Sequence, residues 1–471
     1  MHELSELDRL YRKGGFQMVV LYGRRRVGKT TLALEFGKDK PLLAFTAKVQ
    51  SDALNLADFS RELYAYFSVP VTTGSFSSWD DAFAYLASQA SDQHLVFMFD
   101  EFPYAAGKNS SLVSSLQVAI DRLFTSTNIF LILTGSNQGF MEEKVLGVQG
   151  SRSGLGEKNP LFGRRTAQMK LAPFGYREAA RMLGDTSVED LVRYYACFGG
   201  TPYYLSLIDA NDTFEQNAER LFFSKEGLLY EEPMMLLRQE LREPAMYSSI
   251  MGAIAAGATK IQAIADRIGT DRTALGKYLE TLMALGLVER ATPFGESSRA
   301  SRRGIYSLKE PCFDFWYRFV GPRVDVVEQN AGELAARDAL RAEPLSTHVG
   351  HWFERICREW VIEQAKEDAL PFSPLRFGSW WGTDPATREQ DDIDVVAAEA
   401  TGKTVLLGEC KWRNDFNVTA TVEKLHERLR LVPNAESAFY AVFSKRTIAP
   451  QVRAKFTDHK HLFVSSADLY A

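Results

Sequence analysis

Cysteine and histidine are scarce in this chain, which has four cysteines and seven histidines among 471 residues. The cysteines, Cys197, Cys312, Cys357 and Cys410, show no paired spacing, so we expect neither a disulfide framework nor a zinc site. No apolar run approaches the about 20 residues that span a bilayer, and residues 1–15 lack the apolar core of a secretory signal. We therefore expect a cytoplasmic protein with no membrane partner.

A large excess of charge of one sign is also missing. The net charge is −5, which argues against a general polyanion-binding protein but allows a local basic surface. Hydrophobic residues make up 45 % of the chain, enough for each domain to bury a core. Because domains typically have about 100 to 200 residues, the length predicts three or four of them.

Apolar strands alternate with helical patterns in the first third of the chain. Residues 16–22, 42–47, 95–100 and 129–135 are short, nearly continuous apolar runs. Strands that are buried on both faces have this composition, as in parallel sheets covered by helices. We therefore assign residues 1–170 to the α/β class, as a domain with a doubly wound parallel sheet.

The rest of the chain divides into four further segments. Helical periodicity predicts a helical lid at 171–243, and the charged, weakly apolar residues 311–346 predict a linker or bridging helix. Residues 244–310 predict helices followed by two strands around a polar loop, which is a winged helix-turn-helix. From 347 to 471 the pattern returns to α/β.

Residues 23–30 read GRRRVGKT and match the phosphate-binding pattern G-x-x-x-x-G-K-[ST], with a strand before and a helix after it. Glycines let the loop bend so that its N–H groups face phosphate oxygens. Lys29 would contact the β- and γ-phosphates, and Thr30 would ligate Mg²⁺. The residues expected around the phosphates are Gly23, Arg24, Arg25, Arg26, Val27, Gly28, Lys29, Thr30 and Thr31. An accidental match in this context is rare, so the pattern predicts a P-loop NTPase.

The apolar strand at 95–100 ends in two carboxylates. Asp100 would hold Mg²⁺, directly or through water, and Glu101 would polarise the attacking water as a general base. A solvated acidic turn is the alternative for this pair taken alone. Together with the phosphate loop, the pair favours hydrolysis over nucleotide binding without turnover.

Polar residues after the next strand and two arginines are further candidates. Ser136 or Asn137 would sense the γ-phosphate or position water, unless they only form a turn. Arg164 or Arg165 would reach the triphosphate as an arginine finger, in cis or across the interface of a homo-oligomer. The alternative for these two is a basic pair on the surface.

The winged-helix segment predicts a nucleic-acid surface, with DNA favoured over RNA. The second helix, 271–285, would enter the major groove, and the arginines of the wing would clamp phosphates. The residues concerned are Arg272, Thr273 and Lys277 on the helix and Arg299, Arg302 and Arg303 on the wing. A winged helix that serves only for packing against protein is the alternative.

A second candidate site lies in the last segment. Glu409 and Lys411 are two residues apart on one strand and so share a face, and Asp394 on the neighbouring strand can meet them. This is the D…E-x-K arrangement of restriction-endonuclease-like folds, in which Asp394 and Glu409 would bind Mg²⁺ and Lys411 would orient water. Glu354 would add a carboxylate. Solvent-facing charges at strand ends, or a metal site that is regulatory only, are the alternatives.

The combined motifs resemble the archaeal-type ATPases of prokaryotes, close to the STAND and AAA+ branches of P-loop proteins. The resemblance covers nearly the whole chain and rests on YGRRRVGKTTL (22–32), FDEFPY (99–104), LFGRRT (161–166), GGTPYYL (199–205), KYLETLMALGLVER (277–290) and LLGECKW (406–412). It implies ATP as the nucleotide, with an arginine of 164–165 and the GGTP turn nearby, and supports the D…E-x-K interpretation. The glycine–arginine–glutamate box that usually frames the adenine in such proteins is missing from this chain.

These patterns predict an ATP-regulated enzyme that acts on nucleic acid. ATP binding and hydrolysis would rearrange the ATPase against its lid and expose the winged helix or the nuclease-like domain. Two other classes of function are compatible with the same motifs. One is a regulatory switch or scaffold whose last domain only binds, and the other is a DNA-binding transcription regulator.

Overall fold

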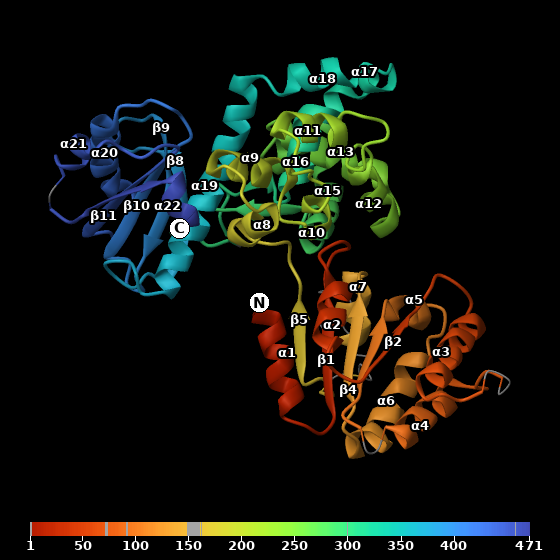
Figure 1. The fold of residues 1–471 in the computed structure, drawn as a ribbon. Coiled ribbons are helices and arrows are strands. Elements are labelled where there is room, and N and C mark those ends of the chain that lie inside the picture. Colours follow the sequence, from red (N-terminus) through yellow and green to blue (C-terminus); the bar gives the residue numbers. More distant parts are fainter. Residues whose placement is uncertain are drawn as a thin grey trace. The chain divides into compact units, whose positions relative to one another are not determined.

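The structure, a computed structural model, describes residues 2–70, 74–90, 93–147, 161, 163–298, 300–456 and 458–471. The chain divides into two compact units, residues 1–173 and residues 174–471. Each unit has its own five-stranded sheet (Figure 1). No helix in the described part of the chain combines the length and the apolar character that crossing a membrane requires.

The first unit is built on a five-stranded parallel sheet. Its strands lie in the order β2 (Leu42–Thr46), β3 (Val96–Asp100), β4 (Phe130–Gly135), β1 (Gln17–Tyr22) and β5 (Ala167–Lys170). Alternate residues of the central strands enter cores on opposite faces: Met18 and Val20 on one face, Val19 and Leu21 on the other. The α/β class with a parallel sheet, expected from the continuous apolar runs, is confirmed.

Helices cover both faces of this sheet (Figure 1). One core contains side chains of α1 (His2–Arg12) and α2 (Lys29–Gly37), and the other contains side chains of α3 (Asp52–Tyr66), α4 (Trp79–Gln89) and α6 (Leu112–Arg122). The remaining short elements are α5 (Phe102–Ala106), η2 (Phe124–Ser126), α7 (Gln138–Phe140) and η3 (Met141–Val145). Because all five strands are parallel, their carboxyl ends share one edge, where polar loop residues can gather.

The second unit begins with helices. They are α8 (Tyr176–Leu183), α9 (Val188–Phe198), α10 (Pro202–Leu205), α11 (Phe214–Phe222), α12 (Glu232–Glu240), α13 (Pro244–Ala255), α14 (Ile261–Ile268) and α15 (Arg272–Ala284). An antiparallel pair of strands, β6 (Val288–Ala291) and β7 (Ile305–Leu308), follows α15.

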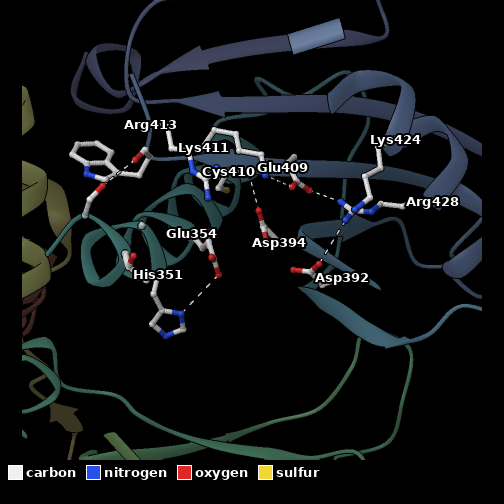
Figure 2. A pocket seen from close by; sticks show the side chains of 14 residues that line it. His351, Glu354, Asp392, Asp394, Glu409, Cys410, Lys411, Arg413, Lys424 and Arg428 are labelled. Carbon is white, nitrogen blue, oxygen red and sulfur yellow. Dashed lines mark hydrogen bonds and ion pairs between the residues drawn. The ribbon is translucent and has the colours of Figure 1, made fainter. Parts of the chain in front are cut away.

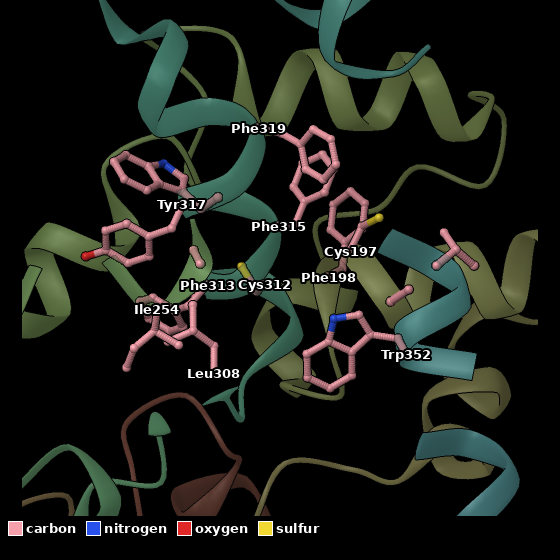
Figure 3. Close-up of a cluster of buried hydrophobic side chains, with 14 of the residues drawn as sticks. Cys197, Phe198, Ile254, Leu308, Cys312, Phe313, Phe315, Tyr317, Phe319 and Trp352 are labelled. Atoms are coloured by element: carbon pink, nitrogen blue, oxygen red, sulfur yellow. The ribbon is translucent and has the colours of Figure 1, made fainter. Parts of the chain in front are cut away.

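The segment expected as a linker or bridging helix, 311–346, packs into the core of the second unit. Its elements are α16 (Pro311–Phe315), η4 (Trp316–Val320), η5 (Gly321–Arg323), α17 (Val324–Glu328), α18 (Gly332–Ala339) and the start of α19 (Ala342–Lys366). Cys312 and Phe315 are fully buried and join Phe198 and Trp352 in one hydrophobic cluster (Figure 3). Most charged residues of this segment are exposed, so its average polarity masks the apolar face of its short helices; Asp314 is buried and pairs with Arg318 at 2.7 Å.

The last part of the chain folds around a mixed sheet. The strands lie in the order β12 (His461–Ser465), β11 (Ser437–Ser444), β10 (Thr404–Lys411), β9 (Gln390–Ala398) and β8 (Arg376–Thr383). The first three are parallel, while β9 and β8 are antiparallel to their neighbours. Helix α19 packs on one face and α20 (Val418–Arg428) on the other. The short elements η6 (Leu429–Leu431), α21 (Pro450–Arg453) and α22 (Ser466–Tyr470) complete the fold.

Candidate functional site

The phosphate-binding pattern forms the turn between β1 and α2, at the carboxyl edge of the parallel sheet. Gly23 has φ +152°, and a Cβ there would lie 2.4 Å from the backbone oxygen of Leu171. Gly28, directly before α2, has φ +88° in the left-handed region. Both positions therefore favour glycine because of their positive φ, and Gly23 also lacks space for a Cβ.

Lys29 lies across this loop. Its Nζ donates hydrogen bonds to the carbonyl oxygens of Gly23 and Arg24, both at 3.0 Å, and the residue is only 6 % exposed. A buried ammonium at the mouth of a loop of backbone N–H groups provides the positive charge that a phosphate needs. Of the other loop residues, Arg24 and Val27 are buried and Thr31 is exposed. Arg25 donates a hydrogen bond to the hydroxyl of Tyr104.

Asp100 is the centre of a hydrogen-bond network at the same edge. Thr30 Oγ1 donates to Asp100 Oδ2 at 3.0 Å, and Thr134 donates to the other carboxylate oxygen. The backbone N–H of Glu101 also donates to Oδ1, at 3.1 Å. The structure thus brings Thr30 and Asp100 together from α2 and β3. A hydroxyl and a carboxylate side by side are hard oxygen donors that fit Mg²⁺.

Glu101 lies next to Ser136. The backbone of Glu101 has φ +49°, in the left-handed region, at the point where β3 turns into α5. Its Oε2 accepts hydrogen bonds from Ser136 Oγ at 2.8 Å and from the Ser136 backbone N–H at 3.2 Å. Asn137 instead caps α7, where its side chain accepts from the N–H of Phe140. Of the two residues considered from sequence, only Ser136 contacts the candidate base.

Arg164 and Arg165 both precede β5 and contact other groups in this structure. Arg164 forms a bidentate ion pair with Asp121, through Nε at 2.6 Å and Nη2 at 2.7 Å. The hydrogen bond from Arg164 lowers the pKa of Asp121. Arg164 is therefore engaged with a carboxylate of α6 in this structure.

The topology explains this outcome. Strand β5 runs parallel to β1, with Ala167 opposite Val19, so residues before Ala167 lie at the amino edge of the sheet. The phosphate loop lies at the carboxyl edge, after β1. Arg165 also precedes β5, and its Nη1 donates to the backbone oxygen of Leu146 at 3.1 Å. The backbone of Arg164 and the phosphate loop thus lie at opposite edges of the sheet, and a contact of Arg164 or Arg165 with the triphosphate stays a prediction.

The residues expected to contact nucleic acid lie on α15 and on the loop between β6 and β7. Arg272, Thr273 and Lys277 are all exposed on α15. Arg302 is exposed, whereas Arg303 pairs with Glu296 and donates to the backbone oxygen of Trp381 at 3.3 Å. Arg299 lies outside the described residues.

The loop between β6 and β7 packs against the mixed sheet rather than projecting from it. The backbone N–H of Phe294 donates to the oxygen of Ser379 on β8 at 2.8 Å. The ring of Phe294 is 8 % exposed and belongs to the same hydrophobic cluster as Trp380 and Ile393. Arg303 is nevertheless exposed, so a phosphate contact by the wing arginines stays a prediction, although this loop is attached to the edge strand of the sheet.

The three residues of the D…E-x-K pattern line one cavity of about 490 Å³ (Figure 2). Asp394 on β9 accepts a hydrogen bond from the backbone N–H of Cys410 at 2.7 Å. Glu409 on β10 pairs with Lys411, with Oε1 and Nζ 2.5 Å apart. Glu354 of α19 lines the same cavity. Burial and the neighbouring carboxylates raise the pKa values of Glu354 and Asp394.

Sequence reasoning missed Arg428, which completes this cluster. It is 2 % exposed, donates to Glu409 Oε2, and pairs with Asp391 at 2.6 Å. Its position was detectable in principle, since it follows Leu425 by three residues on the apolar face of α20 and a charge there needs a partner. Arg428 and Lys411 together engage both oxygens of Glu409.

These ion pairs bear on the expected metal site at Asp394 and Glu409. Within the described ranges, no group of three or more His, Cys, Asp or Glu side chains has an arrangement that could hold a metal ion. Both oxygens of Glu409 are paired with cations. A metal at Asp394 and Glu409 stays a prediction, since both oxygens of Glu409 are engaged in this conformation, and we derive no step through a metal here.

Comparison with known families concerns mainly the first unit. A family described as an ATPase domain predominantly from Archaea matches residues 1–208. The protein is an ATPase. In this ATPase, residues 316–425 also match a family of archaeal and bacterial proteins of unknown function. An uncharacterized protein of Methanocaldococcus jannaschii is 29 % identical to the ATPase over 449 residues, 94 % of each chain.

Two solved structures resemble parts of the ATPase. A Walker-type ATPase of Pyrococcus abyssi has a TM-score of 0.48 and 19 % identity, and covers 67 % of this chain and 95 % of its own. Cdc6p from Pyrobaculum aerophilum has a TM-score of 0.34 and 12 % identity, and covers 70 % of this chain and 94 % of its own. At these values neither likeness supports a conclusion about substrates or partners.

Proposed function

We propose that the first unit hydrolyses ATP with Mg²⁺ at the edge formed by the phosphate loop, Asp100 and Glu101. The observation that carries this proposal is the direct hydrogen bond between Thr30 and Asp100, two oxygen donors brought together from separate elements. In this proposal Lys29 binds the β- and γ-phosphates, Thr30 and Asp100 hold the metal, and Glu101 activates water. Bound Mg²⁺ would neutralise charge on the β- and γ-phosphates.

The contacts of Lys29 and Glu101 given above are those of the site before nucleotide binds. When a triphosphate enters the loop, Lys29 exchanges its bonds to two backbone carbonyls for bonds to phosphate oxygens. Glu101 must direct one carboxylate oxygen at water while Ser136 holds the other. In this arrangement Ser136 orients the base.

The test uses two lysines of the same helix region. Lys29→Ala should lower the rate of ATP hydrolysis by at least about 100-fold, because it removes the charge that stabilises the transferring phosphoryl group. The matched control is Lys38→Ala, since Lys38 is exposed and paired only weakly with Glu35 at 3.7 Å. Unchanged turnover in Lys29→Ala, with a normal Lys38→Ala, would show that the assigned site is wrong.

We further propose that the nucleotide state controls a DNA-binding winged helix at 244–310, with the helices of 171–243 acting as a lid. Three helices followed by the antiparallel pair β6 and β7 support this assignment. The exposed Arg272 and Lys277 at the start of α15 would contact DNA.

Salt-dependent binding of duplex DNA tests the winged helix. Arg272→Ala/Lys277→Ala should weaken binding and reduce its salt dependence, because two phosphate or base contacts are lost. Lys366→Ala/Lys403→Ala removes the same charge elsewhere in the second unit and should bind like the wild type. Equal affinity of all three proteins would exclude α15 as the DNA-binding helix.

A second candidate function is cleavage of nucleic acid at the restriction-endonuclease-like site, in the segment 347–471. Asp394, Glu409 and Lys411 facing one polar cavity favour it. Purified protein would be incubated with single- and double-stranded DNA and RNA, with Mg²⁺ or Mn²⁺ and with or without ATP. Cleavage that disappears in Lys411→Ala would support a nuclease. No cleavage of any substrate would leave a regulatory switch or scaffold as the function of this segment.

A further inference from the structure

Arg428 joins carboxylates from two neighbouring strands of the mixed sheet. Its Nε donates to Oδ2 of Asp391 at 3.1 Å, and its Nη2 donates to Oδ1 at 2.6 Å. Its Nη1 donates to Oε2 of Glu409, and an oxygen of Asp392 lies 3.6 Å from Nη2. Figure 2 shows the guanidinium reaching toward Glu409 and Asp392 at the cavity. One cation therefore holds acids of both β9 and β10.

Helix α20 fixes the place of this guanidinium. Arg428 is the last residue of the helix, and Val422 and Leu425, earlier on the helix, are fully buried in the cluster that contains Ile393 of the sheet. The side chain of Arg428 is only 3 % exposed. Because arginine stays protonated in proteins, the fold keeps one permanent, poorly solvated positive charge at this place.

A divalent ion at this place needs oxygens that two cations already engage. Arg428 contacts Oε2 of Glu409, and Lys411 contacts Oε1. The side chain of Lys411 is 30 % exposed, so it can turn toward solvent, whereas Arg428 must also give up its two bonds to Asp391. A divalent ion beside a guanidinium that stays would meet strong repulsion between like charges, because the site is poorly solvated.

We propose that Arg428 is a built-in cation that keeps divalent metal ions out of the candidate site at Asp394 and Glu409. The guanidinium is part of the chain, so it competes with ions from solution at a high effective concentration. Metal binding then requires that Arg428 leave Glu409, and whatever draws Arg428 away opens the site. The inference rests on the restriction-endonuclease-like site proposed above, but its readout is metal affinity. It can therefore fail or hold whether or not the chain cleaves nucleic acid.

The experiment is a calorimetric titration of MnCl₂ into the full chain without nucleotide. Arg428→Met removes the charge and leaves a long, flexible side chain in its place. This variant should bind Mn²⁺ at least about 10-fold more tightly than the wild type, because a repelling charge at contact distance is gone. Arg428→Met/Asp394→Asn should lose this gain, which distinguishes binding at the cavity from binding at the phosphate loop.

Two variants separate the role of Arg428 from the loss of any positive charge. Lys424→Met removes a cation one turn earlier on α20, which lines the same cavity and lies 3.4 Å from Asp391. The side chain of Lys424 is 57 % exposed, so the Mn²⁺ affinity of this variant should stay within about twofold of wild type. Arg428→Lys keeps a charge at the site and should bind Mn²⁺ as weakly as the wild type.

Thermal unfolding with and without Mn²⁺ gives a second readout. Arg428→Met leaves Glu409 without one of its cations, which lowers stability, and Mn²⁺ should raise the Tm of this variant more than that of the wild type. Arg428→Gln, which still donates hydrogen bonds, takes its place if Arg428→Met does not fold. Equal Mn²⁺ affinity of the wild type and the neutral variant, or a gain that survives Asp394→Asn, would overturn the proposal.

Discussion

Ser136 holds Glu101 by two hydrogen bonds to the same carboxylate oxygen, one from its side chain at 2.8 Å and one from its backbone at 3.2 Å. The two residues follow neighbouring parallel strands, β4 and β3, at the edge that also contains the phosphate loop. The second oxygen of Glu101 is thereby turned in a defined direction. Substitutions at Glu101 and at Ser136 can therefore test the base and the residue that orients it separately.

Ser136→Ala should lower kcat for ATP roughly fivefold and leave KM unchanged, because one hydrogen bond of about 1 kcal/mol to the base is lost while the backbone bond remains. Glu101→Gln should have a much larger effect on kcat. Steady-state hydrolysis assays with varied ATP distinguish the two. A rise in KM with normal kcat would instead place the Ser136 hydroxyl on the nucleotide.

Arg164→Ala should leave ATP hydrolysis within about twofold of wild type, because Arg164 pairs with Asp121 at the opposite edge of the sheet. The partly exposed ion pair should contribute at most about 1 kcal/mol to stability. Hydrolysis rates are measured over a range of protein concentrations, with Arg165→Ala as the companion variant. A large loss of activity that depends on protein concentration would reveal an arginine acting across a homo-oligomer.

Phe294→Ala should destabilise the second unit by about 3 kcal/mol, the typical cost of truncating a buried phenylalanine. The ring joins the loop between β6 and β7 to the cluster beneath the mixed sheet. Urea unfolding of the full chain measures the change. Leu375→Ala is the control, because Leu375 is 71 % exposed. Equal midpoints for both variants would show that the loop is not attached to the sheet in solution.

Glu359 predicts a pH dependence of stability. Burial raises its pKa from an ordinary value of 4.5 to about 7, and its Oε2 has no hydrogen-bond partner among the described residues. Between these two values the folded state keeps a proton that the unfolded state releases. The stabilising contribution is therefore complete below about pH 4.5 and is lost as the pH rises through about 7.

The variant Glu359→Gln cannot ionise and should escape that loss. Its Tm should match the wild type at pH 4.5 and exceed it at pH 8, as measured by thermal unfolding. Glu367→Gln, an exposed change on the same chain segment, should follow the wild type at both values. Parallel Tm curves for the wild type and Glu359→Gln would mean that Glu359 titrates normally.

The sequence by itself determined the parallel sheet and the phosphate loop. Two glycines and a lysine at a fixed spacing, after an apolar strand and before a helix, identified Gly23, Gly28 and Lys29 from the local pattern alone. The proximity of Thr30 and Asp100 was also predictable, because carboxyl ends of parallel strands share an edge. The alternation of side chains along a strand also predicted that Glu409 and Lys411 share one face.

Only the tertiary structure decided which distant groups are paired. Arg428 neutralises Glu409, Arg164 turns to Asp121, and the loop at Phe294 joins β8. These contacts join side chains that are far apart in the sequence, so no spacing pattern predicts them. Their geometry follows from the packing of whole elements. Burial then fixes their charges, because a desolvated charge is stable only where packing supplies a partner.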